Sequence, residues 1–252
     1  MKRTNEMKSL TTALEGLSLF IAEPRAWGVR EFAERAGIAP SNAHRILASL
    51  KQAGYLEQKP AGKTYSLGIR ALELGEAYRR SVNLNLELQA ILDEAALSTG
   101  ETVYLNFLDG TDVVCTQKAS GSAGLQLQIV VGERSSLFRG SRGRAILAFL
   151  PETQREHLIA DYLQQQEVPQ ALRDLVAPEE LLRIRTRGYC FSVGERLNGV
   201  AGVSTPVRKD GAVTASITIG GASERFDEAT VSDHVATAKK LAAQLERHLN
   251  HA

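Results

Sequence analysis

Two apolar helical stripes joined by a tight turn restrict the fold of this chain more than any other feature of its sequence. Apolar residues recur at helical spacing within 29–36 and again within 43–50. Between the stripes, Gly37 supplies the left-handed residue that ends a helix, and Pro40 suits the first turn of the next one. The pattern therefore predicts a short helix, a turn and a longer helix that ends at Gly54, which together form a helix-turn-helix.

The segments on both sides extend this motif into a small domain. A preceding helix is predicted from one apolar stripe, formed by Leu10, Ala13, Leu14, Leu17, Phe20 and Ile21. Downstream, residues 55–58 and 64–67 indicate two short strands around a tip that carries Lys59 and Lys63. We therefore expect three helices and a two-stranded wing within residues 1–68.

The third predicted helix presents polar side chains on the side away from its apolar stripe. They occupy its first two turns and are Ser41, Asn42, His44 and Arg45. In the major groove of DNA, Asn and Arg form paired hydrogen bonds with adenine and guanine, and Ser bonds to either. The wing residues Lys59 and Lys63 could neutralise phosphates, which adds affinity without sequence preference. A solvated face is the alternative for a single helix, but the turn and the wing also favour double-stranded DNA as the partner.

The distribution of charge supports this interpretation. The 252-residue chain has a formal net charge of only +1. Residues 1–82 nevertheless carry 13 Lys and Arg against 8 Glu and no Asp, a balance of +5, so that the remainder has a balance of −4. A basic segment joined to an acidic remainder is typical of a nucleic-acid-binding segment within a larger protein.

Beyond the wing, the sequence predicts a linker helix over residues 69–82 and a second domain over residues 83–252. Apolar and polar residues alternate within 103–107 and 213–219, as in strands with one buried face. Leu125, Leu127 and Ile129 show the same alternation. Strands of this kind form an antiparallel sheet covered by helices, so the expected fold class is α+β.

A loop rich in glycine and arginine stands directly before a predicted helix in this second domain. Its sequence is Arg139-Gly140-Ser141-Arg142-Gly143-Arg144. The two glycines allow close approach of the backbone, and the N–H groups at the start of a helix attract anions, as do the arginines. A flexible loop with solvated arginines fits the composition equally well, because a glycine-rich loop alone is weak evidence.

Several motifs along the chain are more specific in combination than any one of them. In the first half they are Gly37-Ile38-Ala39-Pro40-Ser41-Asn42-Ala43-His44-Arg45-Ile46-Leu47, Gly54-Tyr55-Leu56 and Tyr65-Ser66-Leu67-Gly68. In the second half they are Gly143-Arg144-Ala145-Ile146-Leu147-Ala148, Gly188-Tyr189 through Glu195, Gly199-Val200, Pro206-Val207 and Ala215 to Gly221. From about Leu10 to Leu249, the chain resembles the IclR family of bacterial transcriptional regulators.

The resemblance implies a winged helix-turn-helix, a linker helix and an effector-binding α/β domain related to the GAF and PAS-like folds. It also implies homodimers that pair into tetramers, with one small molecule in each C-terminal domain. In this family the backbone at the positions of Ser141 and Arg142 helps to hold the ligand. The resemblance implies an effector site formed by Ser141, Arg142, Ser192, Val200, Gly202 and Thr218. We add Arg139, which precedes Ser141 in the same loop.

Two departures from the family pattern bear on the effector. Many relatives have acidic residues just after the aromatic-rich strand, whereas here Glu195 is the first acid after Tyr189. Losing a carboxylate at the pocket would remove repulsion toward an anionic ligand. Relatives also commonly have a small polar residue where Gly202 lies, and a glycine at this position leaves more room in the pocket. With the arginines, these departures predict a carboxylate larger than a two-carbon acid, such as an aromatic or branched one.

Two other functions compete with this interpretation. Ser141, Ser192, Cys190 and the five histidines are catalytic residue types, but the sequence has no metal-site spacing, nucleophile elbow, P-loop or dinucleotide fingerprint, so we expect neither an enzyme nor a cofactor or metal. The other alternative is a ligand-independent or architectural DNA-binding protein whose C-terminal half only oligomerises. The sequence leaves repressor and activator equally open.

Cysteine use and hydropathy indicate the compartment. Cys115 and Cys190 lie in predicted strands, where a buried free cysteine packs as a small hydrophobe. No apolar run approaches the roughly 20 residues of a membrane span, and no secretory segment follows the polar start. We therefore expect a cytoplasmic protein without a membrane partner.

Overall fold

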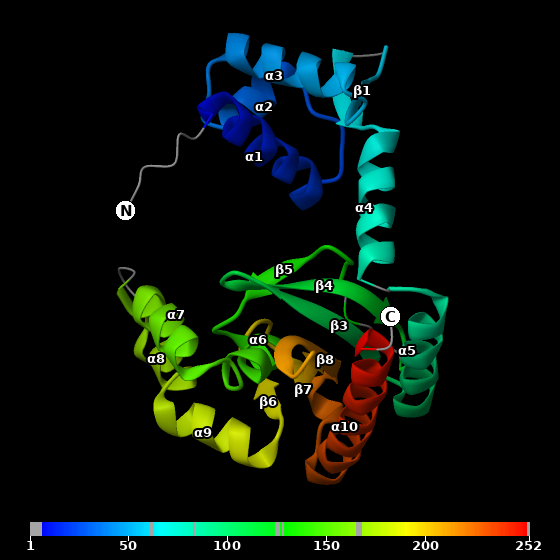
Figure 1. Cartoon of the computed structure of the whole chain (residues 1–252), viewed down its shortest axis with the longest axis vertical. Coiled ribbons are helices and arrows are strands. Elements are labelled where there is room, and N and C mark those ends of the chain that lie inside the picture. Colours follow the sequence, from blue (N-terminus) through cyan, green and yellow to red (C-terminus); the bar gives the residue numbers. More distant parts are fainter. Residues whose placement is uncertain are drawn as a thin grey trace. The chain divides into compact units, whose positions relative to one another are not determined.

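The computed structural model describes residues 7–60, 63–82, 84–123, 127, 129–164 and 168–250. The chain divides into two compact units, Met1–Ser81 and Val82–Ala252, and each is described by itself (Figure 1). Ala61 and Gly62 of the expected wing tip, and Leu125 of the expected alternating segment, lie outside the described residues.

The first unit is a winged helix-turn-helix followed by one more helix (Figure 1). Its elements are α1 (Lys8–Ala22), α2 (Val29–Arg35), α3 (Pro40–Gln52), β1 (Leu56–Gln58), β2 (Tyr65–Leu67) and α4 (Ile69–Ser81). The turn between α2 and α3 follows from its sequence, since Gly37 has φ +63° and Pro40 is the first residue of α3. The strands β1 and β2 pair antiparallel, as the alternation predicts.

The core of this unit is aromatic. Phe20, Trp27 and Phe32 are fully buried together with Leu47, and the rings of Phe20 and Trp27 meet edge to face with centroids 6.4 Å apart. Trp27 also joins the wing, because its N–H donates to the Tyr65 carbonyl at 2.8 Å and its carbonyl accepts from the Tyr65 N–H at 2.8 Å. The segment between α1 and α2 is therefore fixed to the wing.

Helix α1 buries less of its apolar stripe than the sequence predicts. Phe20 is buried, but Leu10, Leu14 and Ile21 are all more than half exposed. The reason is Gly16, which lies directly against the Phe32 ring, so that α1 packs by its Gly16 side. Leu17 still packs against the core, whereas Leu10, Leu14 and Ile21 are left exposed to solvent.

Helix α4 begins where two glycines bring backbone against backbone. The Gly68 N–H donates to the Tyr55 carbonyl at 2.8 Å, and a Cβ on Gly68 would overlap the Gly54 carbonyl oxygen. The end of α3 and the start of α4 are thus packed with no side chain between them. None of the residues of α4 is buried in the chain.

The second unit is built on one antiparallel sheet of six strands in the order β5-β4-β3-β8-β7-β6 (Figure 1). The strands are β3 (Thr102–Asp109), β4 (Asp112–Ala119), β5 (Arg134–Ser136), β6 (Cys190–Val193), β7 (Val200–Lys209) and β8 (Ala212–Ala222). The helices are α5 (Leu86–Thr99), α6 (Gly140–Leu147), α7 (Glu152–Gln164), α8 (Gln170–Leu175), α9 (Pro178–Arg187) and α10 (Glu228–Asn250), with a 3-10 turn η2 (Ser223–Arg225). The expected α+β class is confirmed.

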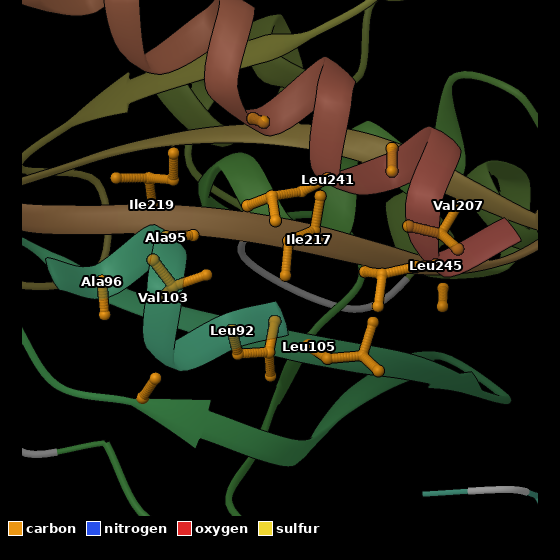
Figure 2. Packing of buried hydrophobic residues seen from close by; sticks show 14 of the residues in the cluster. Leu92, Ala95, Ala96, Val103, Leu105, Val207, Ile217, Ile219, Leu241 and Leu245 are labelled. Atoms are coloured by element: carbon orange, nitrogen blue, oxygen red, sulfur yellow. The ribbon is translucent and has the colours of Figure 1, made fainter. Parts of the chain in front are cut away.

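The two faces of this sheet differ in chemistry because neighbouring residues of a strand point to opposite sides. One face carries Val103, Leu105, Ile217 and Ile219, which pack with Leu92 of α5 and with Leu241 and Leu245 of α10 (Figure 2). The alternate positions on the other face are mainly polar: Tyr104, Asn106, Ser204, Ser216 and Thr218, all buried. Helix α6 contributes to this polar side through hydrogen bonds from Ser204 to Ser141 and from Ser216 to Arg142.

Two residues of the expected alternating segment, Leu127 and Ile129, are described, and neither lies in a strand. Both are buried against Tyr104 and Cys115. At these two positions the alternation corresponds to the burial of side chains.

Candidate functional site

The start of α3 has the exposed polar surface that the sequence predicts. Ala43 and Leu47 are fully buried and fix the orientation of the helix. On its other side, the exposed residues include all four predicted base-contacting residues: Ser41, Asn42, His44 and Arg45. Within the described part of the chain, Arg45 takes part in no ion pair, so its guanidinium is available to an external acceptor.

The wing presents its two predicted lysines to solvent. The Lys59 N–H donates to the Thr64 carbonyl at 2.9 Å and closes the hairpin, and the Lys63 carbonyl accepts from Gln58 Nε2 at 3.5 Å. Both lysine side chains are exposed. The backbone of the hairpin thus holds two cations at the base of its tip.

Two other arginines of the first unit, Arg25 and Arg35, are neutralised internally. Arg25 pairs with Glu23 at 3.1 Å and with Glu31 at 2.6 Å, and Arg35 pairs with Glu23 at 2.9 Å. Arg30, in the first turn of α2, is exposed and has no acidic partner among the described residues. Sequence reasoning missed Arg30, although its place at the start of the first helix of the motif was a usable signal.

In the second unit, the predicted anion site at the start of α6 is formed but already occupied. The Gly140 N–H donates to Glu195 Oε2 at 3.0 Å, and the Ser141 N–H donates to Ser192 Oγ at 2.9 Å. Arg144, which is buried, bonds to the other oxygen of Glu195 and lies 3.3 Å from Glu180. The expectation of a region free of carboxylate is therefore wrong, because the turn after β6 places Glu195 on the helix end.

A chain of buried hydroxyl groups continues from α6 into the sheet. Ser204 Oγ donates to Ser141 Oγ at 2.8 Å and lies 2.8 Å from Thr218 Oγ1, which accepts from Asn106 Nδ2 at 3.2 Å. A Cβ on Gly202 would lie 3.0 Å from Ser141 Oγ, so glycine here makes room for Ser141. These contacts tie the polar face of the sheet to the first turn of α6.

An apolar cluster lies beside the hydroxyl chain and is partly covered by Arg142. The cluster consists of the buried residues Tyr104, Cys115, Leu127 and Ile129, with Val200 packed against it. The Arg142 guanidinium is 5.9 Å from the centroid of the Tyr104 ring. Burial raises the pKa of the Cys115 thiol to about 11 and also raises the pKa of the Tyr104 hydroxyl. The side chains of Tyr104, Cys115 and Arg142 are thus buried together.

Three polar atoms of this region are buried without a hydrogen-bond partner among the described residues. They are Nη1 of Arg142 and Nε of Arg144, both donors, and Oδ1 of Asn106, an acceptor. Buried polar groups in folded proteins are nearly always paired, and an unpaired one costs roughly 1–3 kcal/mol. Two orphan donors on arginines of α6 and one orphan acceptor on β3 are therefore the features by which this region differs from an ordinary core.

The structure brings most of the predicted effector residues together. Ser141, Ser192, Gly202 and Thr218 are joined by the contacts above, and the side chains of Arg142 and Val200 adjoin the same apolar cluster. Arg139 is exposed, and its Nε donates to the Glu195 carbonyl oxygen. The residues that sequence reasoning missed are Tyr104, Asn106, Glu133 and Ser204. Tyr104 and Asn106 are polar members of the alternation that predicted β3, so the signal for them was present.

Both cysteines lie in the interior of the second unit. Cys115 and Cys190 are buried and free, which agrees with a packing role. Among the residues that the structure describes, no cluster of three or more His, Cys, Asp or Glu side chains could hold a metal ion. In the same residues, no helix combines the length and hydropathy needed to cross a membrane.

Comparison with known families assigns both units. Residues 9–60 match the IclR helix-turn-helix domain, and residues 76–247 match the C-terminal domain of the bacterial transcriptional regulator IclR. The chain belongs to the IclR family. This IclR-family protein is thus a DNA-binding transcriptional regulator with an effector-binding C-terminal domain, and the resemblance given by its motifs is confirmed.

Individual relatives of this IclR-family protein agree along nearly the whole chain. The regulator KipR of Bacillus subtilis is 27% identical, covering 98% of this chain and 99% of its own length. The glycerol operon regulatory protein of Streptomyces griseus is 31% identical, covering 96% of both chains. These relatives are regulators and not enzymes, so the enzyme alternative is set aside.

A solved structure shares the fold. The IclR homologue of Microbacterium hydrocarbonoxydans, complexed with 4-hydroxybenzoate, has a TM-score of 0.76 and is 20% identical, covering 97% of this chain and 100% of its own.

Proposed function

We propose that this protein binds operator DNA through α3 and the wing, and that a small carboxylate held in its second unit controls that binding. In this proposal residues 1–68 form the DNA-binding domain and residues 69–82 the linker helix. Residues 83–252 bind the effector and join the chain into cytoplasmic homodimers that pair into tetramers. The observation that carries the proposal is the exposed start of α3 above a fully buried Ala43 and Leu47.

On DNA, the side chains of the helix and of the wing have different tasks. Ser41, Asn42, His44 and Arg45 read base edges, since they occupy the first two turns of the recognition helix. Lys59 and Lys63 neutralise phosphates and contribute affinity that falls as salt rises. The pairing of Arg25 and Arg35 with acids is compatible with this division, because Arg45, Lys59 and Lys63 have no acidic partner among the described residues.

The effector is a carboxylate with an apolar body larger than two carbons. Its site contains the first turn of α6 with Ser141 and Arg142, the facing residues Ser192, Gly202 and Thr218, and Val200 at the apolar cluster, with Arg139 at the outer edge. The cluster around Tyr104 supplies apolar surface for an aromatic or branched group. The 4-hydroxybenzoate complex of the Microbacterium homologue, which shares this fold, supports an aromatic acid as the first compound to test.

Control follows from linkage between the two sites. A ligand that binds one arrangement of the C-terminal domains more tightly shifts the population toward it. Because paired recognition helices must match the spacing of operator half-sites, a shift in that arrangement changes the affinity for the operator. This coupling separates a sensor from a ligand-independent architectural protein.

Footprinting on the neighbouring promoter region with and without a library of carboxylates tests the proposal. We expect a protected operator whose occupancy changes with at least one carboxylate, and a binding constant that falls steeply with salt. Protection that no compound alters would favour the architectural alternative. Calorimetry in which a neutral amine or sugar is preferred over every carboxylate would remove the carboxylate class while leaving the DNA-binding role intact.

A further inference from the structure

The donors at the start of α6 cannot all receive an effector, because most of them already have partners. Glu195 and Ser192 accept from the Gly140 and Ser141 N–H groups, at 3.0 and 2.9 Å. Arg144 lies between two carboxylates, those of Glu180 and Glu195. The positive charge that remains within the site must therefore come from another group.

Arg142 is that group. Its side chain is 4% exposed, and its Nη2 donates to Glu133 Oε1 at 3.1 Å. The same oxygen accepts from Arg196 at 2.6 Å, so one carboxylate serves two guanidinium groups. The Glu133–Arg142–Arg196 cluster therefore has one uncompensated positive charge. Although burial acts to raise the pKa of Glu133, the hydrogen bond from Arg142 and the charge of Arg196 hold it below its usual value.

The second nitrogen of Arg142 shows where that charge can be used. Nη1 is buried and has no hydrogen-bond partner among the described residues. It belongs to a guanidinium that lies over the Tyr104 ring, next to the buried side chains of Tyr104 and Cys115. In such surroundings an ion pair is much stronger than in water, and leaving the donor unfilled is costly.

We propose that the Arg142 side chain, and not the backbone of α6, determines the selectivity of this site for carboxylates: Nη1 receives one carboxylate oxygen of the effector while Glu133 holds Nη2. The assignment rests on the carboxylate effector proposed above and adds the group that recognises it. Glu133 acts as a positioning residue, because its carboxylate accepts from Nη2 and so fixes the orientation of the Arg142 guanidinium. The apolar part of the effector then lies against the cluster of Tyr104, Leu127 and Val200.

The test compares a carboxylate with its own carboxamide, which has nearly the same shape and no charge. The probes are 4-hydroxybenzoate with 4-hydroxybenzamide and 3-methylbutanoate with 3-methylbutanamide, titrated into the full-length protein by calorimetry. We expect the unsubstituted protein to prefer at least one carboxylate over its amide by about tenfold or more, the size expected for a charge-assisted hydrogen bond. Arg142→Gln should bring the two affinities to within about twofold.

Two further variants keep the test independent of folding defects. Arg247→Gln, which removes an exposed arginine of α10 outside the effector site, should leave the ratio of carboxylate to amide affinity unchanged. Glu133→Gln keeps an acceptor for Nη2 but removes a competing negative charge, so carboxylate affinity should rise by about threefold or more while amide affinity stays constant. If Arg142→Gln does not fold, the Glu133→Gln result decides alone.

The possible failures are distinguishable. A preference for carboxylate that survives Arg142→Gln, or carboxylate affinity unchanged in Glu133→Gln, overturns the assignment of Arg142 and leaves the carboxylate effector standing. If the unsubstituted protein binds the amides as well as the acids, or binds none of the four probes, the assignment is overturned together with the effector class. Salt-dependent binding of DNA is unaffected by either outcome.

Discussion

Arg45 and Lys63 are both exposed cations of the first unit, but they lie on elements that meet DNA in different ways. Arg45 lies in the second turn of α3, and Lys63 lies at the base of the wing tip. We expect Arg45→Ala to weaken binding to the operator by about 1–3 kcal/mol and to change binding to random DNA little. Lys63→Ala should weaken both alike and reduce the salt dependence by about one phosphate contact.

Gel shifts on operator and random duplexes at several salt concentrations measure both effects. Arg35→Ala is the matched control, since its guanidinium is already paired with Glu23 at 2.9 Å. Equal losses on operator and random DNA in Arg45→Ala would remove Arg45 from base readout.

His234 gives the second unit a dependence on pH. It is 4% exposed on α10, its Nε2 has no partner among the described residues, and its ring lies 5.0 Å from that of Phe226. Burial lowers its pKa from the ordinary 6.5, against the opposing charges of Glu101 and Asp233. Between that lowered value and 6.5 the unfolded chain binds more protons than the folded one, so the stability held above pH 6.5 is lost as pH falls through this range.

Urea unfolding followed by circular dichroism at about pH 7.5 and 5.5 measures this contribution. His234→Gln should reduce the fall in the free energy of unfolding between the two conditions. His157→Gln serves as control, because that side chain is 77% exposed. A pH dependence that is identical in the unsubstituted protein and in His234→Gln would contradict the assignment.

Individual side chains were predictable where their role depends on local sequence. The exposure of Asn42 opposite a buried Ala43 follows from helical periodicity alone. The contact of Glu195 with Gly140 was not predictable in the same way, because 55 residues separate them along the chain. Glu133 likewise meets Arg196 across 63 residues. Only the sheet order and the turn after β6 bring these groups together.

At the scale of elements, the junction of the wing with α4 offers a sharp test of packing. A Cβ on Gly68 would overlap the Gly54 carbonyl oxygen, whereas Gly75, on α4, has no atom within 4 Å of such a Cβ. Gly68→Ala should therefore lower the free energy of unfolding of the first unit by about 1–3 kcal/mol. Gly75→Ala should not lower it, and should raise it by up to about 1 kcal/mol through helix propensity.

Trp27, the single tryptophan of the chain, lies in the core of this unit, so its fluorescence during urea unfolding reports the first unit selectively. A Gly68→Ala variant as stable as the unsubstituted protein would mean that the backbone contact is not tight.

The sequence predicts an element correctly where the signal is local. It predicts the element's burial or pairing incorrectly where packing against another element determines the outcome. Gly37 and Pro40 mark the turn of the helix-turn-helix without help from the rest of the fold. The alternation at Leu127 and Ile129 resembles a strand, yet both residues lie outside the strands and are buried against Tyr104 and Cys115. The apolar stripe of α1 was read correctly as helical, but Gly16 against Phe32 decides which side is buried.

At the scale of the whole molecule, the proposed pairing of recognition helices makes operator spacing decisive. Two half-sites on one face of B-DNA are separated by whole helical turns of about 10–10.5 base pairs. Inserting about 5 base pairs between the half-sites should reduce affinity to that of a single half-site, and inserting about 10 should restore part of it. Gel shifts on these three operators provide the measurement. Affinity that is independent of spacing would show that each DNA-binding domain acts alone.

The two faces of the central sheet also have a consequence for substitutions along β8. Thr218 belongs to the hydroxyl chain, while its neighbours Ile217 and Ile219 point into the packed side under α10. We therefore expect substitutions at the positions of β8 that face α6 to alter the proposed effector site, while the intervening residues keep the core under α10 intact. Along β8, the residues that face the proposed effector site thus alternate with the residues that hold the fold together.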